Sequence, residues 1–452
     1  MSANFPKVLF VTPHAFNQVT GGGITFSNLF NGWPKTSIAT VHNDPEPTTS
    51  DVCDQYYVLG EDELDYVEPI SSVRRVLRSR KSGQFADERP GAQSVEQAEI
   101  RTTKSRQISS CIKSAGIKLL GTSFPERARL SPSLERWIEE YRPEVIYTIL
   151  GTNGMIKLVE DIADRFELPI VVHFMDDWMA ASHRQGMLAP IMRKEMLRLV
   201  NSVVGRAKCC LAISPAMKEA YEVRFGRGFE AFQNTIDFDQ WSKFAKRDIN
   251  CSEVADIVYI GSIFPNAQLD ALVQCCQAVA ELNRSGVPAK LTISSPSGHG
   301  ERYRSVLQVD PCIEIIETIR DDTSFFQRIA KADLLLLPVN FDEESIRFIQ
   351  YSMPTKVPAY LTAGGPILVY GPAQAAQVAY ALTDGWGYIV DQKSLCDLVD
   401  GMREVLLNVD LRTKLVTSAR LKAKENHDLN VVRAEFQKRI IDAVSPDQKV
   451  GQ

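Results

Sequence analysis

The sequence lacks the patterns that mark metal-binding, secreted and membrane-spanning proteins. Its nine cysteines form no CxxC pair and no Cys/His cluster, and the adjacent cysteines at 209-210 and 275-276 lie within apolar runs, which is typical of reduced thiols in a core. No run of 18 apolar residues occurs. The N-terminus enters a strand-like segment without a basic region followed by a long apolar one. We therefore expect a cytoplasmic protein that needs no metal or other cofactor.

The sequence also lacks a strong net charge and any extreme composition. A formal net charge of −5 argues against a nucleic acid partner bound over the whole surface, although it leaves local basic patches open. With 44% hydrophobic and 24% charged residues, the composition is that of a folded globular protein. A chain of 452 residues exceeds the size of a single hydrophobic core, so we expect two domains.

The first half of the chain alternates short apolar runs with amphipathic stretches. Such runs are typical of parallel strands that are buried on both faces, and amphipathic stretches such as 153–166 and 187–207 predict helices between them. The region from about 71 to 135 breaks this rhythm, because it is polar and rich in Arg and Ser, and we interpret it as a helical excursion. The strands predicted for this half are 7–12, 37–42, 144–149, 169–174 and 209–214.

The second half repeats the pattern, which predicts an α/β protein with two doubly wound, Rossmann-like domains. The stretch around residue 245 has no long apolar element, so we place the linker there. Domains at 1–244 and 245–427 follow, and the segment 428–452 begins with Asp428 as the N-cap of an amphipathic helix. The strands predicted for this half are 256–262, 290–295, 312–318, 333–339 and 366–371.

Three glycines follow the first predicted strand, and ligands of such sheets bind at the carboxyl ends of the strands. Gly21, Gly22 and Gly23 open a helix that carries Thr25. Glycines let backbone amides approach an anion, and a helix N-terminus favours negative charge. The spacing matches neither GxGxxG nor GxxxxGK[ST], so a flexible turn is the simpler interpretation of the glycines alone.

A histidine and two acids follow the predicted strand 169–174. His173, Asp176 and Asp177 either form part of a site or, in the case of the histidine, belong to a hydrogen-bonded core. The two acids are neighbours without a third carboxylate, which does not favour a metal site. Ser214 and Asn234 follow later strands, where helix capping is the simplest explanation for each.

A polar cluster precedes a short predicted helix at 357–363. Ser352, Thr355 and Lys356 bring two hydroxyls and one ammonium to the start of this helix. Such groups together with a helix N-terminus favour the binding of an anion.

The motifs, taken in order, resemble those of the GT-B glycosyltransferases, specifically the retaining family 4 type. The resemblance covers nearly the whole chain: a strand followed by GGG, then HFMDDW, AISPAM, QNTID, YIGS, ADLLLLPV and PTKVPAYLTAGGPILVYGP. It implies two domains that face a central cleft. A nucleotide sugar would be held mainly by the second domain and an acceptor mainly by the first. The C-terminal helix would fold back across both domains.

The resemblance also implies roles for individual residues. Gly22 and Gly23 would approach the donor diphosphate, and His173 would lie near the anomeric carbon. The diphosphate would be met by Ser352, Thr355 and Lys356, and the turn around 318–320, beginning with Thr318, would hold the base. In the mechanism attributed to this family, the departing phosphate receives the acceptor proton.

The sequence departs from the family pattern at several positions. The two glutamates usual in the donor-binding segment are replaced by Tyr351 and Ala359, so the contact with the donor ribose is in doubt. The cations usual after the first strand of the second domain are absent. That segment offers Ser262, and the local replacements are Lys356 and Arg347. Glu343 and Glu344 could supply a displaced ribose contact or form an exposed acidic loop.

Two readings of the function follow. The first is a hexosyltransferase-type enzyme that transfers a sugar to a glycan, lipid-linked or protein acceptor. The second is an inactive GT-B scaffold that binds a nucleotide sugar or a partner protein. The basic segment 71–83 could contact an anionic membrane surface, although a solvated helix face is the simpler interpretation.

Overall fold

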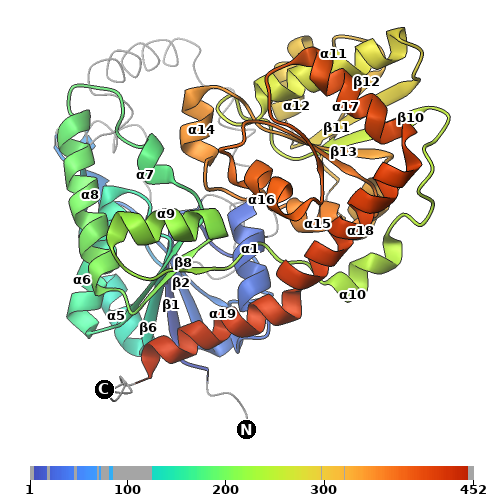
Figure 1. The fold of residues 1–452 in the computed structure, drawn as a ribbon. Coiled ribbons are helices and arrows are strands. Elements are labelled where there is room, and N and C mark those ends of the chain that lie inside the picture. Colours follow the sequence, from blue (N-terminus) through green and yellow to red (C-terminus); the bar gives the residue numbers. More distant parts are fainter. Residues whose placement is uncertain are drawn as a thin grey trace, which may run out of the picture. The chain divides into compact units, whose positions relative to one another are not determined.

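The computed structural model describes residues 5–17, 21–44, 48–68, 71–72, 81–84, 125–296, 298–319 and 321–445 (Figure 1). Most of the expected helical excursion at 71–135, and residues 73–80 of the basic segment, lie outside the described residues. Within that region the structure shows a strand at Glu126–Ala128, which pairs antiparallel with Leu64–Tyr66. The helical prediction is therefore wrong for these three residues, because the partner strand satisfies their backbone groups instead.

The chain folds into two compact units. Unit 1 comprises Met1–Ala212, Ala220–Glu230 and Glu435–Gln452, and unit 2 comprises Ile213–Glu219 and Ala231–Ala434. Compared with the expected boundary near 245, the segment 231–244 belongs to unit 2. The reason is visible in its bonds, since Asn234 Nδ2 donates to Met353 O at 3.0 Å.

Unit 1 contains a parallel sheet in the order β3-β2-β1-β6-β7-β8-β9. Its predicted strands are confirmed, since every residue of β1, β2, β6 and β7 is buried, as expected for strands covered on both faces. The strands of the first half are β1 (Val8–Val11), β2 (Ile38–His42), β3 (Gln55–Val58), β4 (Leu64–Tyr66), β5 (Glu126–Ala128), β6 (Val145–Thr148), β7 (Ile170–Phe174), β8 (Cys209–Ala212) and β9 (Glu230–Ala231).

Unit 2 contains a parallel sheet in the order β12-β11-β10-β13-β14-β15. Unit 2 thus has the 3-2-1-4-5-6 arrangement of doubly wound domains, and unit 1 has the same order with β9 added as a seventh strand. In both, the strand order reverses beside the first strand. The strands of unit 2 are β10 (Ala255–Ile260), β11 (Ala289–Ser295), β12 (Ile313–Glu317), β13 (Leu334–Pro338), β14 (Ile367–Tyr370) and β15 (Tyr388–Val390).

The helices alternate with the strands, as expected for βαβ units (Figure 1). In chain order they are α1 (Gly21–Phe30), η1 (Lys35–Ser37), α5 (Pro132–Tyr141), α6 (Asn153–Phe166), α7 (Trp178–Ala181), α8 (Ala189–Arg206), α9 (Pro215–Phe225), α10 (Phe238–Trp241), η2 (Ser242–Phe244), α11 (Leu269–Arg284), α12 (His299–Leu307), α13 (Asp322–Ala330), α14 (Glu343–Ile349), α15 (Val357–Thr362), α16 (Ala376–Asp384), α17 (Leu395–Leu407), α18 (Val409–Asn426) and α19 (Leu429–Val444). Among the described helices, none combines the length and the apolar character needed to cross a bilayer.

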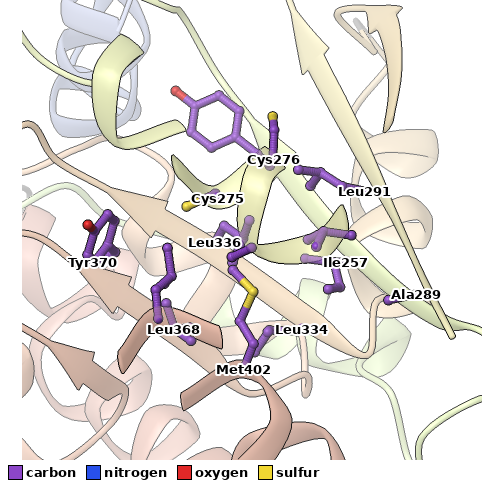
Figure 2. Packing of buried hydrophobic residues seen from close by; sticks show 14 of the residues in the cluster. Ile257, Cys275, Cys276, Ala289, Leu291, Leu334, Leu336, Leu368, Tyr370 and Met402 are labelled. Carbon is purple, nitrogen blue, oxygen red and sulfur yellow. The ribbon is translucent and has the colours of Figure 1, made fainter. Parts of the chain in front are cut away.

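The core of unit 2 shows why the two halves of the sheet stay together. Figure 2 shows Cys275 and Cys276 of α11 packed among aliphatic side chains from the central strands, such as Leu336 and Leu368. Both thiols are fully buried and free, and burial raises the pKa of Cys276 to about 12. The prediction of reduced core thiols is therefore confirmed for this pair.

The last helix belongs to both units. Asp428 caps α19 by accepting a hydrogen bond from Asn430 N at 2.9 Å, which confirms the predicted N-cap. From Glu435 onward the helix belongs to unit 1, and the Phe436 ring packs edge-on against Phe30 with the centroids 5.2 Å apart.

Candidate nucleotide-sugar site

In open α/β sheets, ligands bind outside the carboxyl ends of the strands, where the strand order reverses. In unit 2 this point lies between β10 and β13. The chain leaves β10 through Gly261 and Ser262. Gly261 N donates to Ser294 O at 2.9 Å, which holds this exit against the end of the neighbouring strand β11.

One cation reaches this point. Lys356, the residue before α15, places its Nζ 3.9 Å from the centroid of the Tyr259 ring on β10. A Cβ atom at Gly261 would lie 2.8 Å from the same Nζ, and the φ angle of Gly261 is +144°. The backbone conformation favours glycine here, and an added Cβ would displace the flexible end of the Lys356 side chain.

The environment of Lys356 makes its charge responsive to a ligand. Within the part of the chain that the structure describes, its ammonium has no ion pair with a carboxylate and no hydrogen bond, and the Tyr259 ring faces it instead. Burial lowers the pKa of Lys356 to about 7. An anion placed beside it would favour the charged form, so binding of an anion would be coupled to uptake of a proton.

Hydrogen bonds fix the elements around Lys356. The Tyr259 hydroxyl donates to Ser262 O at 2.6 Å, and Ile260 N donates to the Tyr360 hydroxyl at 2.9 Å. Burial raises the pKa of both phenols well above the ordinary value, so both remain neutral hydrogen-bonding groups. The second bond links β10 to α15, and the first holds the turn after β10 in place, so the two bonds fix the backbone around the lysine.

The segment before α15 is also anchored within unit 2. Ser214 Oγ donates to Tyr351 O at 2.7 Å and accepts a bond from Met217 N at 3.1 Å. The expected capping role of Ser214 is thus confirmed, with an additional role as an anchor. Asn234 is not a helix cap, since its side chain bonds to Met353 O and α10 is capped by Asp237.

The remaining donor-side predictions fall into different environments. The hydroxyls of Ser352 and Thr318 are buried and have no partner among the described residues. Thr355 and Arg347 are exposed, and Ser262 is partly buried. A buried hydroxyl without a partner is unfavourable, so Ser352 and Thr318 are open to a polar ligand.

The two positions where the family has glutamates, and the two nearby acids, have different surroundings, and a displaced ribose contact through Glu343 or Glu344 stays a prediction. Ala359 is only 8% exposed, packed within α15. Glu343 and Glu344 are exposed in the first turn of α14, whose N-cap is Asp342. Acids in a first turn favour the helix dipole, which is the simpler of their two explanations.

In unit 1 the three glycines form the first turn of α1. A Cβ at Gly23 would lie 2.4 Å from the Asn17 side chain, whereas Gly22 is less crowded. The hydroxyl of Thr25 donates to Gly21 O at 2.8 Å. Close packing against Asn17 explains the glycine at position 23. A role of Gly22 and Gly23 in holding phosphate stays a prediction.

His173 lies inside the aromatic core of unit 1. It is completely buried, and its Nδ1 shares a hydrogen bond of 2.6 Å with the Tyr147 hydroxyl. Its ring centroid is 6.2 Å from that of Phe436, and burial lowers its pKa to about 3. Nε2 has no partner among the described residues. This geometry favours the core interpretation, and a place beside the sugar stays a prediction.

The two acids after β7, Asp176 and Asp177, differ in their hydrogen-bond partners. Asp177 is 2% exposed and accepts bonds from Tyr221 Oη at 2.8 Å and from Arg224 Nη1 and Nη2 at 2.8 and 3.0 Å, which supports an anchoring role for it. Asp176 accepts a bond from Trp178 N at 3.1 Å, and burial raises its pKa. A catalytic role for either acid stays a prediction.

The sequence analysis missed three side chains near the carboxyl ends of β1 and β2 in unit 1, those of His14, His42 and Asp44. His14 Nδ1 lies 3.6 Å from Asp44 Oδ2, and Asp44 N donates to His42 Nδ1 at 3.2 Å. The sequence carried a signal for them, since His14 and Asp44 lie within three residues of the ends of β1 and β2. No group of three or more metal-ligating side chains occurs among the residues that the structure describes.

Comparisons with known proteins agree with this architecture. No protein-family model matches the sequence, and no curated protein matches it. Several solved structures match over nearly the full length of both chains. Sucrose-phosphate synthase from Thermosynechococcus elongatus has a TM-score of 0.61 at 11% identity and covers 97% of this chain and 100% of its own. The structure of Anabaena HepE in complex with UDP and glucose has a TM-score of 0.59 at 10% identity. The match covers 96% of this chain and 99% of the HepE chain.

WaaG, a glycosyltransferase involved in lipopolysaccharide biosynthesis, has a TM-score of 0.58 at 11% identity and covers 97% of this chain and 100% of its own. At such low identity the likeness establishes the fold and nothing finer. The chain has the fold of the GT-B glycosyltransferases, with two Rossmann-like domains.

Proposed function

We propose that the protein is a retaining, family 4-like hexosyltransferase. It moves a sugar from a nucleoside-diphosphate sugar to a glycan, lipid-linked or protein acceptor without a metal ion. The fold, the order of the motifs and the position of Lys356 support this proposal. The solved relatives add to it, since HepE is described in complex with UDP-glucose.

The observation that carries the proposal is the position of the Lys356 ammonium. The family cations expected after β10 are absent from the sequence, yet Lys356 Nζ reaches the exit of that strand from α15. This position supports our proposal that Lys356 is the cation that meets the diphosphate. Ser352 and Thr318, in the same unit, each have a buried hydroxyl without a partner among the described residues.

The chemistry requires stabilisation of the leaving group. The bond between the anomeric carbon and the diphosphate oxygen breaks as the acceptor oxygen bonds to the same face of that carbon, and the acceptor proton passes to the departing phosphate. Negative charge accumulates on the diphosphate, so preorganised cations and hydrogen-bond donors beside it lower the barrier. Lys356 is proposed to supply this charge.

A thermal-shift panel of UDP-, GDP- and TDP-sugars tests the proposal. A ligand that binds only the folded state raises the melting temperature by mass action. One nucleotide class should stabilise the protein, with the same shift in the presence of EDTA. If no nucleotide sugar shifts the melting temperature, or if the shift requires Mg²⁺ or Mn²⁺, the proposal is contradicted.

A second function, that of an inactive GT-B scaffold, is favoured by one specific observation. Ala359 and Tyr351 replace the family glutamates, and Ala359 is buried. A scaffold would bind the nucleotide sugar but release neither free sugar nor a transfer product. Detection of nucleoside diphosphate released from the stabilising donor separates the two functions.

The cytoplasmic location and the contact of segment 71–83 with a membrane stay predictions. Residues 73–80 of that segment lie outside the described residues, so its test is biochemical.

A further inference from the structure

A second side chain reaches the turn of unit 2 that Lys356 approaches. This turn, residues 261–263, leaves β10, and the Lys356 ammonium lies close to its first residue, Gly261. At its last residue, Ile263 N donates to His299 Nδ1 at 3.4 Å. Two residues of backbone span at most about 7 Å, so the ammonium and the imidazole meet the same short stretch of chain.

The bond from Ile263 fixes which ring nitrogen of His299 can donate. A backbone N–H group only donates, so Nδ1 accepts here and the neutral ring carries its proton on Nε2. Within the part of the chain that the structure describes, Nε2 has no hydrogen-bond partner and the ring has no ion pair with a carboxylate. The imidazole therefore has one unused N–H group.

Packing holds the imidazole in place. His299 is half-buried and is the first residue of α12, which lies beside β11 and β12 (Figure 1). The ring of Phe264, which follows the 261–263 turn, meets the imidazole edge-on with the centroids 5.4 Å apart. A Cβ at Gly300 would lie 2.6 Å from Ile315 Cγ2 on β12, so the first turn of α12 lies close against the sheet.

The start of α12 favours a negatively charged partner. Its N-cap is Gly298, which has no side chain to accept bonds from the first amides of the helix. The helix N-terminus and the Nε2–H group of His299 therefore both offer donors. The acid in the first turn, Glu301, is exposed and accepts a bond from Arg304 Nε at 3.0 Å.

A buried hydroxyl lies on the face of the sheet that α12 covers. Ser295, at the end of β11, is 2% exposed, and its Oγ has no partner among the described residues. It follows Ile293 by two residues, and Ile293 pairs in register with Ile315, the residue that the first turn of α12 approaches. A buried hydroxyl without a partner is unfavourable, so this end of β11 is open to a polar ligand.

We infer that His299 is a second donor-binding residue, whose Nε2–H group donates a hydrogen bond to the diphosphate of the nucleotide sugar. This role rests on the proposed function and extends its donor site by one residue. The chain from Gly261 to Asn283 contains no Lys or Arg, so groups from other segments have to meet the diphosphate at the 261–263 turn. Lys356 brings an ammonium, and His299 brings a neutral donor. An ionised phosphate oxygen only accepts hydrogen bonds, which matches a nitrogen that only donates.

Calorimetric titrations with UDP, GDP and TDP, and with the three matching nucleosides, test this role. For the diphosphate that the wild type binds most tightly, His299→Leu should lower the affinity on the order of tenfold, as expected for a lost hydrogen bond to a charged group. His299→Gln should retain most of the affinity, because its amide N–H can replace the Nε2–H group. The matching nucleoside should bind the wild type and both variants equally.

A control variant and a second readout separate this role from a general effect on the fold. Ser305→Ala changes an exposed residue of the same helix and should bind as the wild type does. Proton uptake on binding, which depends on Lys356, should persist in His299→Leu because this variant keeps the ammonium. Circular dichroism confirms that each variant is folded.

The contrary results are distinct. Unchanged diphosphate affinity in His299→Leu, an equal loss for nucleoside and diphosphate, or an equal loss in Ser305→Ala would overturn the role of His299 and leave the proposed function standing. A His299→Gln variant that binds as weakly as His299→Leu would contradict a hydrogen bond from the Nε2 position. Failure of the wild type to bind any of the three diphosphates would overturn the proposed function and the role of His299 together.

Discussion

The Nζ atom of Lys356 lies 3.9 Å from the centroid of the Tyr259 ring, where β10 reaches the reversal of strand order in unit 2. The contact joins two elements that are far apart in the sequence. An aromatic face attracts a cation without cancelling its charge, so the ammonium remains available to an anion.

Removal of the Tyr259 ring should weaken nucleotide binding. A cation–π contact shielded from water contributes about 1 to 2 kcal/mol, so Tyr259→Leu should lower the affinity for a nucleoside diphosphate roughly fivefold to thirtyfold in a calorimetric titration. Tyr259→Phe keeps the ring and should bind within about twofold of the wild type, because it loses only the neutral hydrogen bond to Ser262 O. Equal losses in the two variants would mean that the hydroxyl, rather than the ring, matters.

A methyl group at Gly261 should displace the lysine. The Cβ of Gly261→Ala would come within 2.8 Å of Nζ, so we expect a loss of nucleotide affinity on the order of tenfold. Gly286→Ala is the control, because its φ is also positive, at +84°, but no atom lies within 4 Å of the added carbon. Both variants should lose some stability, whereas only Gly261→Ala should lose affinity. Wild-type affinity in Gly261→Ala would contradict the proposed place of the ammonium.

A buried ion network should dominate the stability of unit 2. Asp333 is fully buried, pairs with Lys246 and accepts a bond from Asp256 N at 2.9 Å, with the buried Arg412 guanidinium 3.9 Å away. Asp333→Asn would leave Arg412 uncompensated, so the free energy of unfolding should fall by about 3 to 5 kcal/mol in urea titrations. Asp400→Asn, which breaks the exposed pair with Arg403, should change it by less than about 1 kcal/mol.

The same carboxylate predicts how stability responds to acid. Burial alone would raise the pKa of Asp333, but hydrogen bonds from Asp256 N and Lys246 outweigh it and hold the pKa below the ordinary value. A depressed pKa in the folded state contributes stability above the pKa of the unfolded chain, and that contribution is lost as the pH falls through the folded-state pKa. Asp333→Asn should therefore flatten the acid limb of the stability profile. An unchanged limb would contradict the assignment.

His173 should affect transfer and stability but leave nucleotide binding intact. His173→Ala removes the partner of the Tyr147 hydroxyl and leaves a cavity, so we expect a loss of roughly 2 to 4 kcal/mol in unfolding free energy. If the histidine lies near the sugar during the reaction, transfer should fall strongly in His173→Ala and also in His173→Phe, which refills the cavity. Full activity of the folded Phe variant would leave His173 a core residue.

Much of the fold was predictable because its strongest signals are local. The amphipathic stretch 153–166 became α6 with the same bounds, and Thr152 caps it through a bond from Met155 N. Continuous apolar runs marked the central strands. The edge strand β3 was missed because its apolar run is short, and in the structure only Tyr57 of its four residues is buried.

The candidate site was predictable in part. The lysine and hydroxyls before α15 were visible as a polar cluster in the sequence. The Tyr259 ring, the closeness of Gly261 and the anchors from Ser214 and Asn234 to the segment 351–353 depend on tertiary packing. The six-residue α15 agrees within one residue with the short helix predicted at 357–363, and Pro358, visible in the sequence, removes one backbone donor from its first turn.

The most direct test of the central claim is the pH dependence of nucleoside diphosphate binding to the wild type and to Lys356→Met. Because the pKa of Lys356 is lowered to about 7, wild-type affinity should fall as the pH rises from 7 to 9, with proton uptake on binding. Lys356→Met should bind roughly tenfold to a hundredfold more weakly at pH 7, as expected for a lost charge-assisted contact of about 1.5 to 3 kcal/mol, and should show no such fall. The bare nucleoside should bind both proteins equally. Equal losses for nucleoside and diphosphate, or the same alkaline fall in both proteins, would contradict the claim that Lys356 holds the donor phosphates.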